Sequence, residues 1–265
     1  MNTPKVVAII QARMGSSRLP GKVLKDIAGK PMLVWVVERS RQARSVDQVV
    51  VATTTDPSDD AIERLCEDHR IPVYRGNQFD VLDRYYQAAV HFQAEVIVRL
   101  TADCPLMDPV EIDHVLNEFN QEGVDFAANR LPPPWKRTYP IGLDIEVCSF
   151  SVLERAWKEA TLPYEREHVM PYLYDEPGRF KIKVVDHDYD YGDLRWTVDT
   201  PEDLDLLRQI FALLKDRERF SWHDVLAVVE KHPDLNLINR SVNAKSVGEV
   251  DHRYGAKPGS GEKSL

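Results

Sequence analysis

The sequence predicts an α/β protein built on a mostly parallel, twisted sheet with helices on both faces. Short β-branched apolar runs, such as residues 5–11 (KVVAIIQ) and 95–100 (EVIVRL), alternate with longer segments whose apolar residues have helical spacing. Such runs fit strands that are buried on both faces, and their alternation with helices is typical of βαβ units. The second half alternates less strictly, so we expect a smaller antiparallel excursion there.

The first half supplies the parallel strands. A helix with Pro31 at its first position follows the first strand. Asp108 and Pro109 form an N-cap and a first-turn proline, which start a helix that ends near residue 121. Further strands are expected at 48–52, 72–74 and 95–100, and further helices at 31–41, 57–69 and 79–92.

The second half mixes several kinds of element. Residues 130–140 hold four prolines and no periodicity, which predicts a loop, and residues 143–147 alternate as a half-exposed strand should. Other strands are expected at 124–127, 180–185 and 194–198, and helices at 149–161, 200–214 and 221–232. We expect one domain over residues 1–240 and a partly disordered tail over 241–265, which is rich in Gly, Ser and Lys near its end.

Composition excludes several classes of protein. The 265 residues are 43% hydrophobic and 29% charged, and 34 basic against 43 acidic residues give a net charge of −9. An acidic chain lacks the basic field that nucleic acids and anionic membranes require. The three cysteines are widely spaced, and no apolar run is long enough for a signal sequence or a membrane span. We therefore expect a cytoplasmic protein with no nucleic-acid or membrane partner.

A glycine- and serine-containing loop follows the first strand. Residues 11–24 (QARMGSSRLPGKVL) carry three cations, Arg13, Arg18 and Lys22, beside Gly15. Backbone N–H groups and small side chains can cradle phosphate oxygens while cations neutralise them, and open α/β sheets bind ligands at this position. The glycine spacing fits neither a Walker A loop nor a dinucleotide-binding loop. The alternative is a flexible basic turn, but so many cations after a buried strand favour phosphate binding.

Two aspartates lie where a second ligand could bind. Asp103 follows the strand at 95–100, and Asp199 precedes the helix at 200–214. Neither is needed as a helix cap, because Asp108 and Thr200 are better placed. An uncompensated pair of carboxylates in one crevice would repel. This leaves Asp103 and Asp199 available for a ligand.

Seven segments in order resemble the sugar nucleotidyltransferases. They most resemble the cytidylyltransferase branch, which includes CMP-Kdo and acylneuraminate cytidylyltransferases, and within it the SpsF-like members of spore-coat polysaccharide biosynthesis. The segments are IIQARMGSSRLPGKVL, GKPML, VLDRYYQAA, RLTADCPLMDP, GLDIEV, EREHVMPYL and WTVDTPEDL. The resemblance extends to about residue 239. It implies the nucleotide-diphospho-sugar transferase (GT-A-like) fold.

The resemblance also implies a reaction. An acceptor oxygen of a sugar or sugar acid would attack the α-phosphorus of CTP, and pyrophosphate would leave. Arg13, Arg18 and Lys22 would neutralise the phosphates, and Asp103 and Asp199 would bind Mg²⁺, for which two carboxylates with waters and phosphate oxygens suffice. The family further implies a homodimer.

The resemblance assigns two further groups of residues. The nucleotide contacts would be Ala12, Gly15, Ser16, Arg75 and Arg84. Arg84 would reach the cytosine edge, although a solvated helix charge or a partner of Asp83 explains it nearly as well. The acceptor contacts would be Gly142, Asp144, Glu146, Arg166 and His168. For the last two, an amphipathic helix with solvated charges is the alternative.

Two other functions compete with nucleotidyl transfer. A glycosyltransferase of the same fold usually carries an Asp-X-Asp motif, but the matches at 186–188 and 203–205 do not follow a central strand of the first half. A nucleotide-binding subunit without catalysis is the second rival. The presence of Lys22, Asp103 and Asp199 together argues against it.

Overall fold

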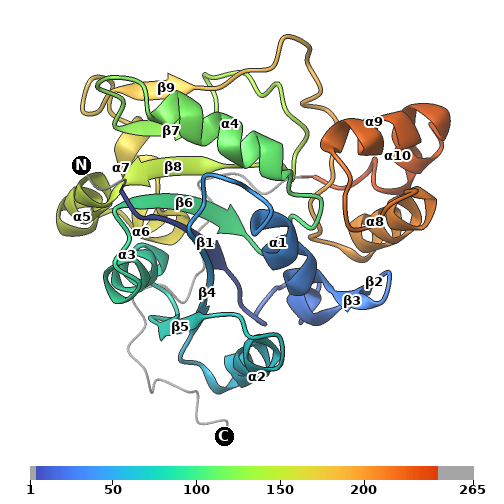
Figure 1. Ribbon diagram of the computed structural model, residues 1–265, viewed down its shortest axis with the longest axis horizontal. Coiled ribbons are helices and arrows are strands. Elements are labelled where there is room, and N and C mark those ends of the chain that lie inside the picture. Colours follow the sequence, from blue (N-terminus) through green and yellow to red (C-terminus); the bar gives the residue numbers. More distant parts are fainter. Residues whose placement is uncertain (1–3, 244–265) are drawn as a thin grey trace, which may run out of the picture.

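A computed structural model describes residues 4–243, which contain a seven-stranded sheet in the order β5-β4-β1-β6-β8-β7-β9 (Figure 1). Four neighbouring strands are parallel: β5 (Val73–Gly76), β4 (Gln48–Thr54), β1 (Val6–Gln11) and β6 (Val96–Thr101). The other three are β8 (Glu146–Ser149), β7 (Phe126–Ala128) and β9 (Ile182–Val184). Only β8 runs against the rest, because β6 and β7 both pair with it in antiparallel fashion. The mostly parallel sheet with an antiparallel excursion is confirmed.

Helices cover both faces of the sheet, as predicted. One face packs against α1 (Met32–Ser40), α2 (Asp60–Asp68) and α4 (Pro109–Phe119). The opposite face packs against α3 (Val81–His91), α5 (Phe150–Glu159) and α7 (Pro171–Tyr174), and α6 (Pro163–His168) packs against α3. Two apolar cores result, one on each side of the sheet.

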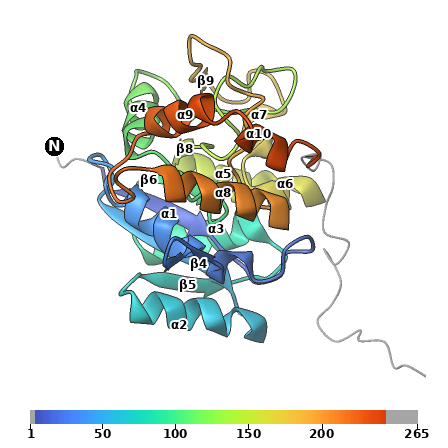
Figure 2. The same cartoon turned by 90° about the vertical axis from the view of Figure 1, so that its right-hand side faces the viewer.

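The last helices lie together beside α1. They are α8 (Pro201–Leu213), α9 (Trp222–Lys231) and α10 (Leu235–Ile238). Figures 1 and 2 show them on one side of the molecule, next to a small hairpin of β2 (Asp26–Ile27) and β3 (Lys30–Pro31). Two 3₁₀ turns, η1 (Lys22–Leu24) and η2 (Pro57–Asp59), complete the elements.

Helix caps fix where the site residues lie. Asp108 accepts a hydrogen bond from the Val110 backbone N–H at 2.8 Å and caps α4, as predicted. Thr200 and Asp203 form the capping box of α8. The strand order reverses at β1, with β4 on one side and β6 on the other. The carboxyl ends of β1 and β6 therefore lie at the switch point of the sheet, the position where such sheets bind ligands.

Several elements differ from the sequence-based prediction. Residues 194–198 form no strand and make only one isolated bridge, from Arg195 to Ile141, because this segment hydrogen-bonds to loops on both sides instead of to a long strand. The strand expected at 143–147 begins at Glu146 and is buried rather than half-exposed. Pro31 precedes α1 as its N-cap.

Other elements were not predicted. These are the hairpin of β2 and β3 and the short helices α6, α7 and α10. The prediction of a disordered tail lies, from residue 244 on, outside the described residues. Over residues 4–243, no helix combines the length and apolar character that a membrane crossing requires.

Candidate active site

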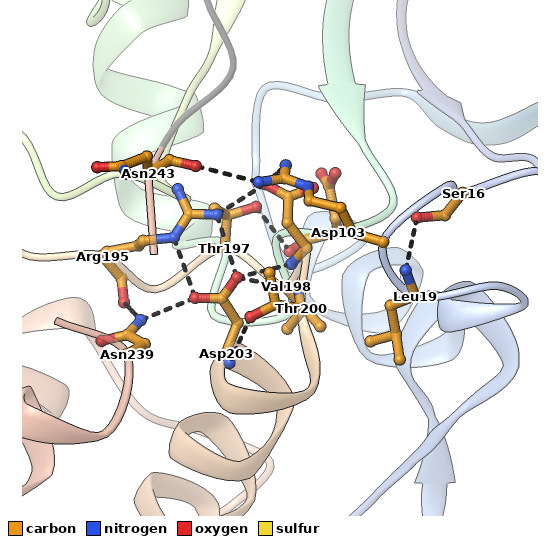
Figure 3. A network of polar contacts seen from close by, with 12 residues as sticks. Ser16, Leu19, Asp103, Arg195, Thr197, Val198, Thr200, Asp203, Asn239 and Asn243 are labelled. Carbon is orange, nitrogen blue, oxygen red and sulfur yellow. Dashed lines mark hydrogen bonds and ion pairs between the residues drawn. The ribbon is translucent and has the colours of Figure 1, made fainter. Parts of the chain in front are cut away.

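The loop after β1 is held in place by short polar contacts. Its Met14 backbone N–H donates to Asp59 Oδ1 at 2.7 Å, and the Gly21 N–H donates to the Met14 carbonyl at 3.0 Å. Gly21 has φ +66°, a left-handed conformation that suits glycine. The Ser16 hydroxyl accepts from the Leu19 N–H at 3.3 Å, as Figure 3 shows. These contacts within the protein therefore give the loop a defined shape.

Asp59 anchors this loop to the end of β4, and the sequence analysis missed it. The residue is buried, and its carboxylate accepts from the hydroxyls of Thr54 at 2.5 Å and Thr53 at 3.2 Å. Ala12 adds a backbone bond from its N–H to the Ala52 carbonyl at 3.1 Å. The available signal was an aspartate in the short turn that follows a run of threonines at a strand end.

Lys22 joins the two aspartates. Its Nζ donates to Asp103 Oδ2 at 2.7 Å, to Asp199 Oδ1 at 2.9 Å and to the Val198 carbonyl at 2.8 Å. The lysine comes from η1, Asp103 from the segment after β6, and Asp199 from the segment before α8. The structure thus brings together three residues that the sequence analysis selected separately.

The charges of this cluster support one another. Burial by itself lowers the pKa of Lys22, but the two carboxylates outweigh that effect, and its pKa lies above the ordinary value. Burial raises the pKa of Asp199, yet Lys22 and then Arg195 and Arg18 overcome it and bring the pKa to about 2. Asp103 also has a pKa below its ordinary value, since Lys22 outweighs the effect of burial. All three groups are charged at neutral pH.

Two arginines also hold Asp199. Arg18 NH2 lies 3.0 Å and Arg195 NH2 lies 2.7 Å from Asp199 Oδ2. The expectation of an uncompensated carboxylate pair is therefore wrong, because Lys22, Arg18 and Arg195 surround Asp199 with positive charge. Arg18 also donates to the Asn243 carbonyl at 3.1 Å.

Asp203 organises the segment that presents Asp199. Its buried carboxylate accepts from the backbone N–H groups of Asp199 at 2.9 Å and Thr200 at 3.1 Å, and from Arg195 Nε at 3.0 Å. Asn239 Nδ2 donates to the same carboxylate at 2.8 Å and to the Arg195 carbonyl at 3.0 Å. Figure 3 shows these side chains gathered at the start of α8. The sequence analysis missed the positioning role of Arg195 and Asn239.

Two of the predicted nucleotide contacts, Arg84 and Arg75, have different surroundings. Arg84 is buried under Gly76, donates to the Asn77 carbonyl at 2.8 Å, and has its pKa lowered to about 10 by burial, so it is neither solvated nor paired with Asp83. The structure does not bring Arg75 to the loop. Its guanidinium is engaged by the carboxylates of Asp60 and Glu63 and by the backbone at the end of β4. It therefore ties β5 to α2.

Three of the predicted acceptor residues make structural contacts. Arg166 forms a bidentate ion pair with Asp80, the N-cap of α3, with its closest contact at 2.6 Å. Asp144 pairs with Arg137 at 2.5 Å. Gly142 has φ +112°, and a Cβ there would lie 2.6 Å from the Thr197 nitrogen. Gly142 therefore lies against the segment that leads to Asp199, and burial and then the charges of Asp103 and Asp144 raise the pKa of Cys104.

The other two acceptor residues lie in one buried cluster. Glu146 on β8 forms an ion pair with Arg99 on the neighbouring strand β6. His168 ends α6, and the charges of Arg99 and Glu146 both act on its ring. Arg99 was not selected by the sequence analysis, although a lone arginine inside an apolar strand was a signal.

The fold and the site together define a class of protein. A cationic loop after the first strand faces two aspartates at the switch point of a mostly parallel sheet, which is the arrangement of a nucleotidyltransferase. A profile of the cytidylyltransferase family matches residues 7–231. The chain belongs to the cytidylyltransferase family.

Individual relatives agree with this assignment. The solved structure of a cytidylyltransferase from Leptospira borgpetersenii is 34% identical, with a TM-score of 0.84, covering 91% of this chain and all of that one. A 3-deoxy-manno-octulosonate cytidylyltransferase of Anaeromyxobacter dehalogenans is 31% identical over 78% of this chain and 98% of its own. The spore coat polysaccharide biosynthesis protein SpsF of Bacillus subtilis is 29% identical over 86% and 95%.

Proposed function

We propose that the protein transfers CMP from CTP to a sugar acid or phosphorylated sugar, with release of pyrophosphate, in the synthesis of a surface polysaccharide or related glycan. The observation that carries this proposal is the contact of Lys22 with both Asp103 and Asp199 beside the phosphate loop. The acceptor class is supported by the relative that acts on 3-deoxy-manno-octulosonate, and the pathway by SpsF. A homodimer and a cytoplasmic location stay predictions of the sequence.

The site residues also fit a magnesium ion. Carboxylate oxygens of Asp103 and Asp199 converge on the Lys22 nitrogen, so both already point at one positive charge. Within residues 4–243, no cluster of three or more His, Cys, Asp or Glu side chains is arranged so that it could hold a metal ion. Two carboxylates suit Mg²⁺, which completes its shell with waters and substrate phosphates. Bound here, Mg²⁺ would neutralise charge on the triphosphate.

Catalysis by this chain would then consist of positioning and charge neutralisation. Lys22 and Arg18 would turn from the aspartates to the phosphates of the nucleotide, and backbone N–H groups of residues 14–21 would orient those phosphates. Arg195 would keep Asp199 in place, because it also holds the buried Asp203. No covalent nucleophile is required.

A screen for pyrophosphate release tests the proposal. CTP, UTP, ATP and GTP are each offered with a panel of sugar acids and phosphosugars, in the presence and absence of Mg²⁺. We expect release from CTP with an anionic acceptor, and loss of that release in Asp103→Asn. Transfer from a nucleotide sugar would instead favour the glycosyltransferase alternative. Tight CTP binding without turnover on any acceptor would favour a non-catalytic subunit.

A further inference from the structure

A second group of buried charges lies on the face of the sheet that packs against α3 and α5. Arg99 projects from β6 with only 13% of its side chain exposed, and Glu146 pairs with it from β8. Arg99 NH2 also approaches Gln11 Oε1 at 3.4 Å. Gln11 is the last residue of β1, so the guanidinium lies next to the start of the phosphate loop. The charged group therefore borders the proposed nucleotide site.

This group has hydrogen-bonding capacity that the protein does not use. Arg99 Nε and His168 Nε2 are both buried and have no hydrogen-bond partner. Arg130, whose charge also acts on His168, forms no ion pair or hydrogen bond within residues 4–243. Leaving a buried polar atom unpaired costs about 1–3 kcal/mol, so these two buried atoms, with the half-buried Arg130 near them, favour a ligand here.

The backbone after His168 is strained. Val169 has φ +74° and ψ −56°, and the Met170 N–H donates to the His168 carbonyl at 2.9 Å. This is a γ-turn at a β-branched residue, a conformation that costs on the order of 1–3 kcal/mol. The turn ends α6 and fixes where the His168 ring lies. Strain of this kind beside unpaired polar atoms is typical of a binding site.

The histidine is neutral in this environment. Burial is the largest cause that lowers the pKa of His168. Arg99 and Arg130 lower this pKa further, and Glu167 and Glu146 oppose them. A neutral imidazole can exchange a hydrogen bond with a hydroxyl group, whereas an arginine N–H suits an anionic oxygen. The unused groups therefore match a molecule that carries both an anion and hydroxyls.

We propose that Arg99 and Arg130 bind the anionic group of the acceptor, and that His168 Nε2 hydrogen-bonds to a neighbouring acceptor hydroxyl. Glu146 acts as a positioning residue that orients Arg99. The proposal rests on the proposed function, because it makes this cluster the acceptor part of the same site. Its ligand chemistry, a carboxylate or a phosphate on a hydroxylated molecule, is that of a sugar acid or a phosphosugar. Arg99 and Arg130 would then determine acceptor specificity.

The first test uses NMR of the His168 ring, assigned with a His168→Gln variant. Acetate and inorganic phosphate are titrated as separate probes. We expect at least one of them to shift the ring signals, and its dissociation constant to rise about tenfold in Arg130→Gln, which keeps the Arg99–Glu146 pair intact. Arg155→Gln, an exposed arginine on α5, is the matched control and should bind like wild type. Absence of any shift, or equal affinity in all three proteins, overturns the proposal.

The second test separates this subsite from the nucleotide site. Arg99→Lys and Arg130→Gln should bind CTP with wild-type affinity in calorimetry, while KM for the anionic acceptor rises about tenfold and kcat changes little. A fall in kcat with unchanged KM would contradict binding of the acceptor by these residues. If wild type binds the probe anion at His168 but not CTP, the proposed function fails while the subsite stands. If the protein turns over CTP but neither Arg99→Lys nor Arg130→Gln changes KM for the acceptor, the subsite fails while the proposed function stands.

Discussion

Lys22 balances two carboxylates in the free chain, so its removal has consequences for folding as well as for chemistry. Lys22→Ala should lower turnover by about 10²-fold, because a charge aimed at the phosphates is lost. Breaking a buried ion pair costs about 3–5 kcal/mol, but part of each side chain here is exposed, and we expect about 1–3 kcal/mol. Pyrophosphate release and urea unfolding measure the two effects.

The double variant Lys22→Ala/Asp103→Asn is the control for this prediction. Removing one carboxylate relieves the repulsion left by the missing lysine, so stability should recover while turnover stays low. Turnover near wild type in Lys22→Ala would remove the lysine from the site.

The same contact predicts how the free protein binds metal. Because the Lys22 ammonium lies between Asp103 and Asp199, a divalent ion must displace it. We expect Mn²⁺, followed by electron paramagnetic resonance, to bind the free wild-type protein weakly and Lys22→Gln more tightly. Adding Asp199→Asn to Lys22→Gln should abolish this gain in Mn²⁺ affinity. Equal Mn²⁺ affinity in wild type and Lys22→Gln would show that the metal binds elsewhere.

His168 predicts a dependence of stability on pH. Its pKa in the folded state lies below the ordinary value of about 6.5, so the unfolded chain takes up a proton first as the pH falls. The stability that neutral His168 contributes is therefore complete above about pH 6.5 and is lost below it. His168→Gln should flatten the unfolding free energy between about pH 7 and 5 relative to wild type. Parallel curves for the two proteins would contradict the prediction.

At the scale of elements, the segment 194–199 depends on a close approach by another loop. Gly142 lies against the backbone of Trp196 and Thr197, and its φ of +112° is unfavourable for a side chain. Gly142→Ala should displace the segment that carries Asp199 and lower the free energy of unfolding by about 2–4 kcal/mol, together with activity. Urea unfolding and pyrophosphate release measure these losses.

Gly178→Ala is the matched control for the close contact that a Cβ at Gly142 would make. Gly178 also has a positive φ, +83°, but a Cβ there would meet nothing within 4 Å. It should cost only about 1 kcal/mol of backbone strain and leave activity unchanged. Equal losses in the two variants would mean that strain alone, and not contact with residues 196–197, explains the effect.

Element-level prediction from the sequence succeeded where a local rule applied. Asp108 and Thr200 cap their helices as their positions indicated, which left Asp103 and Asp199 for the site. The prediction failed for the strand expected at 194–198. An apolar pattern indicates that a segment is buried, but it does not indicate which segment its backbone hydrogen-bonds to. A resemblance likewise gives a position but not a contact: it selected Arg75 and Arg166, and the structure adds the acidic side chains that contact them, Asp60 and Glu63 for Arg75 and Asp80 for Arg166.

At the scale of the whole molecule, the site depends on the folding of both ends of the chain. Lys22 and Asp199 are 177 residues apart, and the sheet brings them together where its strand order reverses at β1. The fold class could be predicted, since strand and helix periods alternate along the first half. The Arg99–Glu146 pair could not, because it depends on β8 joining β6 in antiparallel register. No local pattern encodes that register.

Because the nucleotide would bind both halves of the site, its binding should stabilise the whole fold. A ligand at 100 times its dissociation constant adds about 2.7 kcal/mol, which for a chain of this size raises Tm by roughly 5–10 °C. With Mg²⁺ present, CTP should raise Tm by about this amount, and UTP, ATP and GTP at equal concentration by less. Scanning calorimetry measures the shifts, and Lys22→Ala, which weakens phosphate binding, should show a smaller response to CTP. A larger shift with UTP or a purine nucleotide would contradict the choice of CTP while leaving the phosphate loop intact.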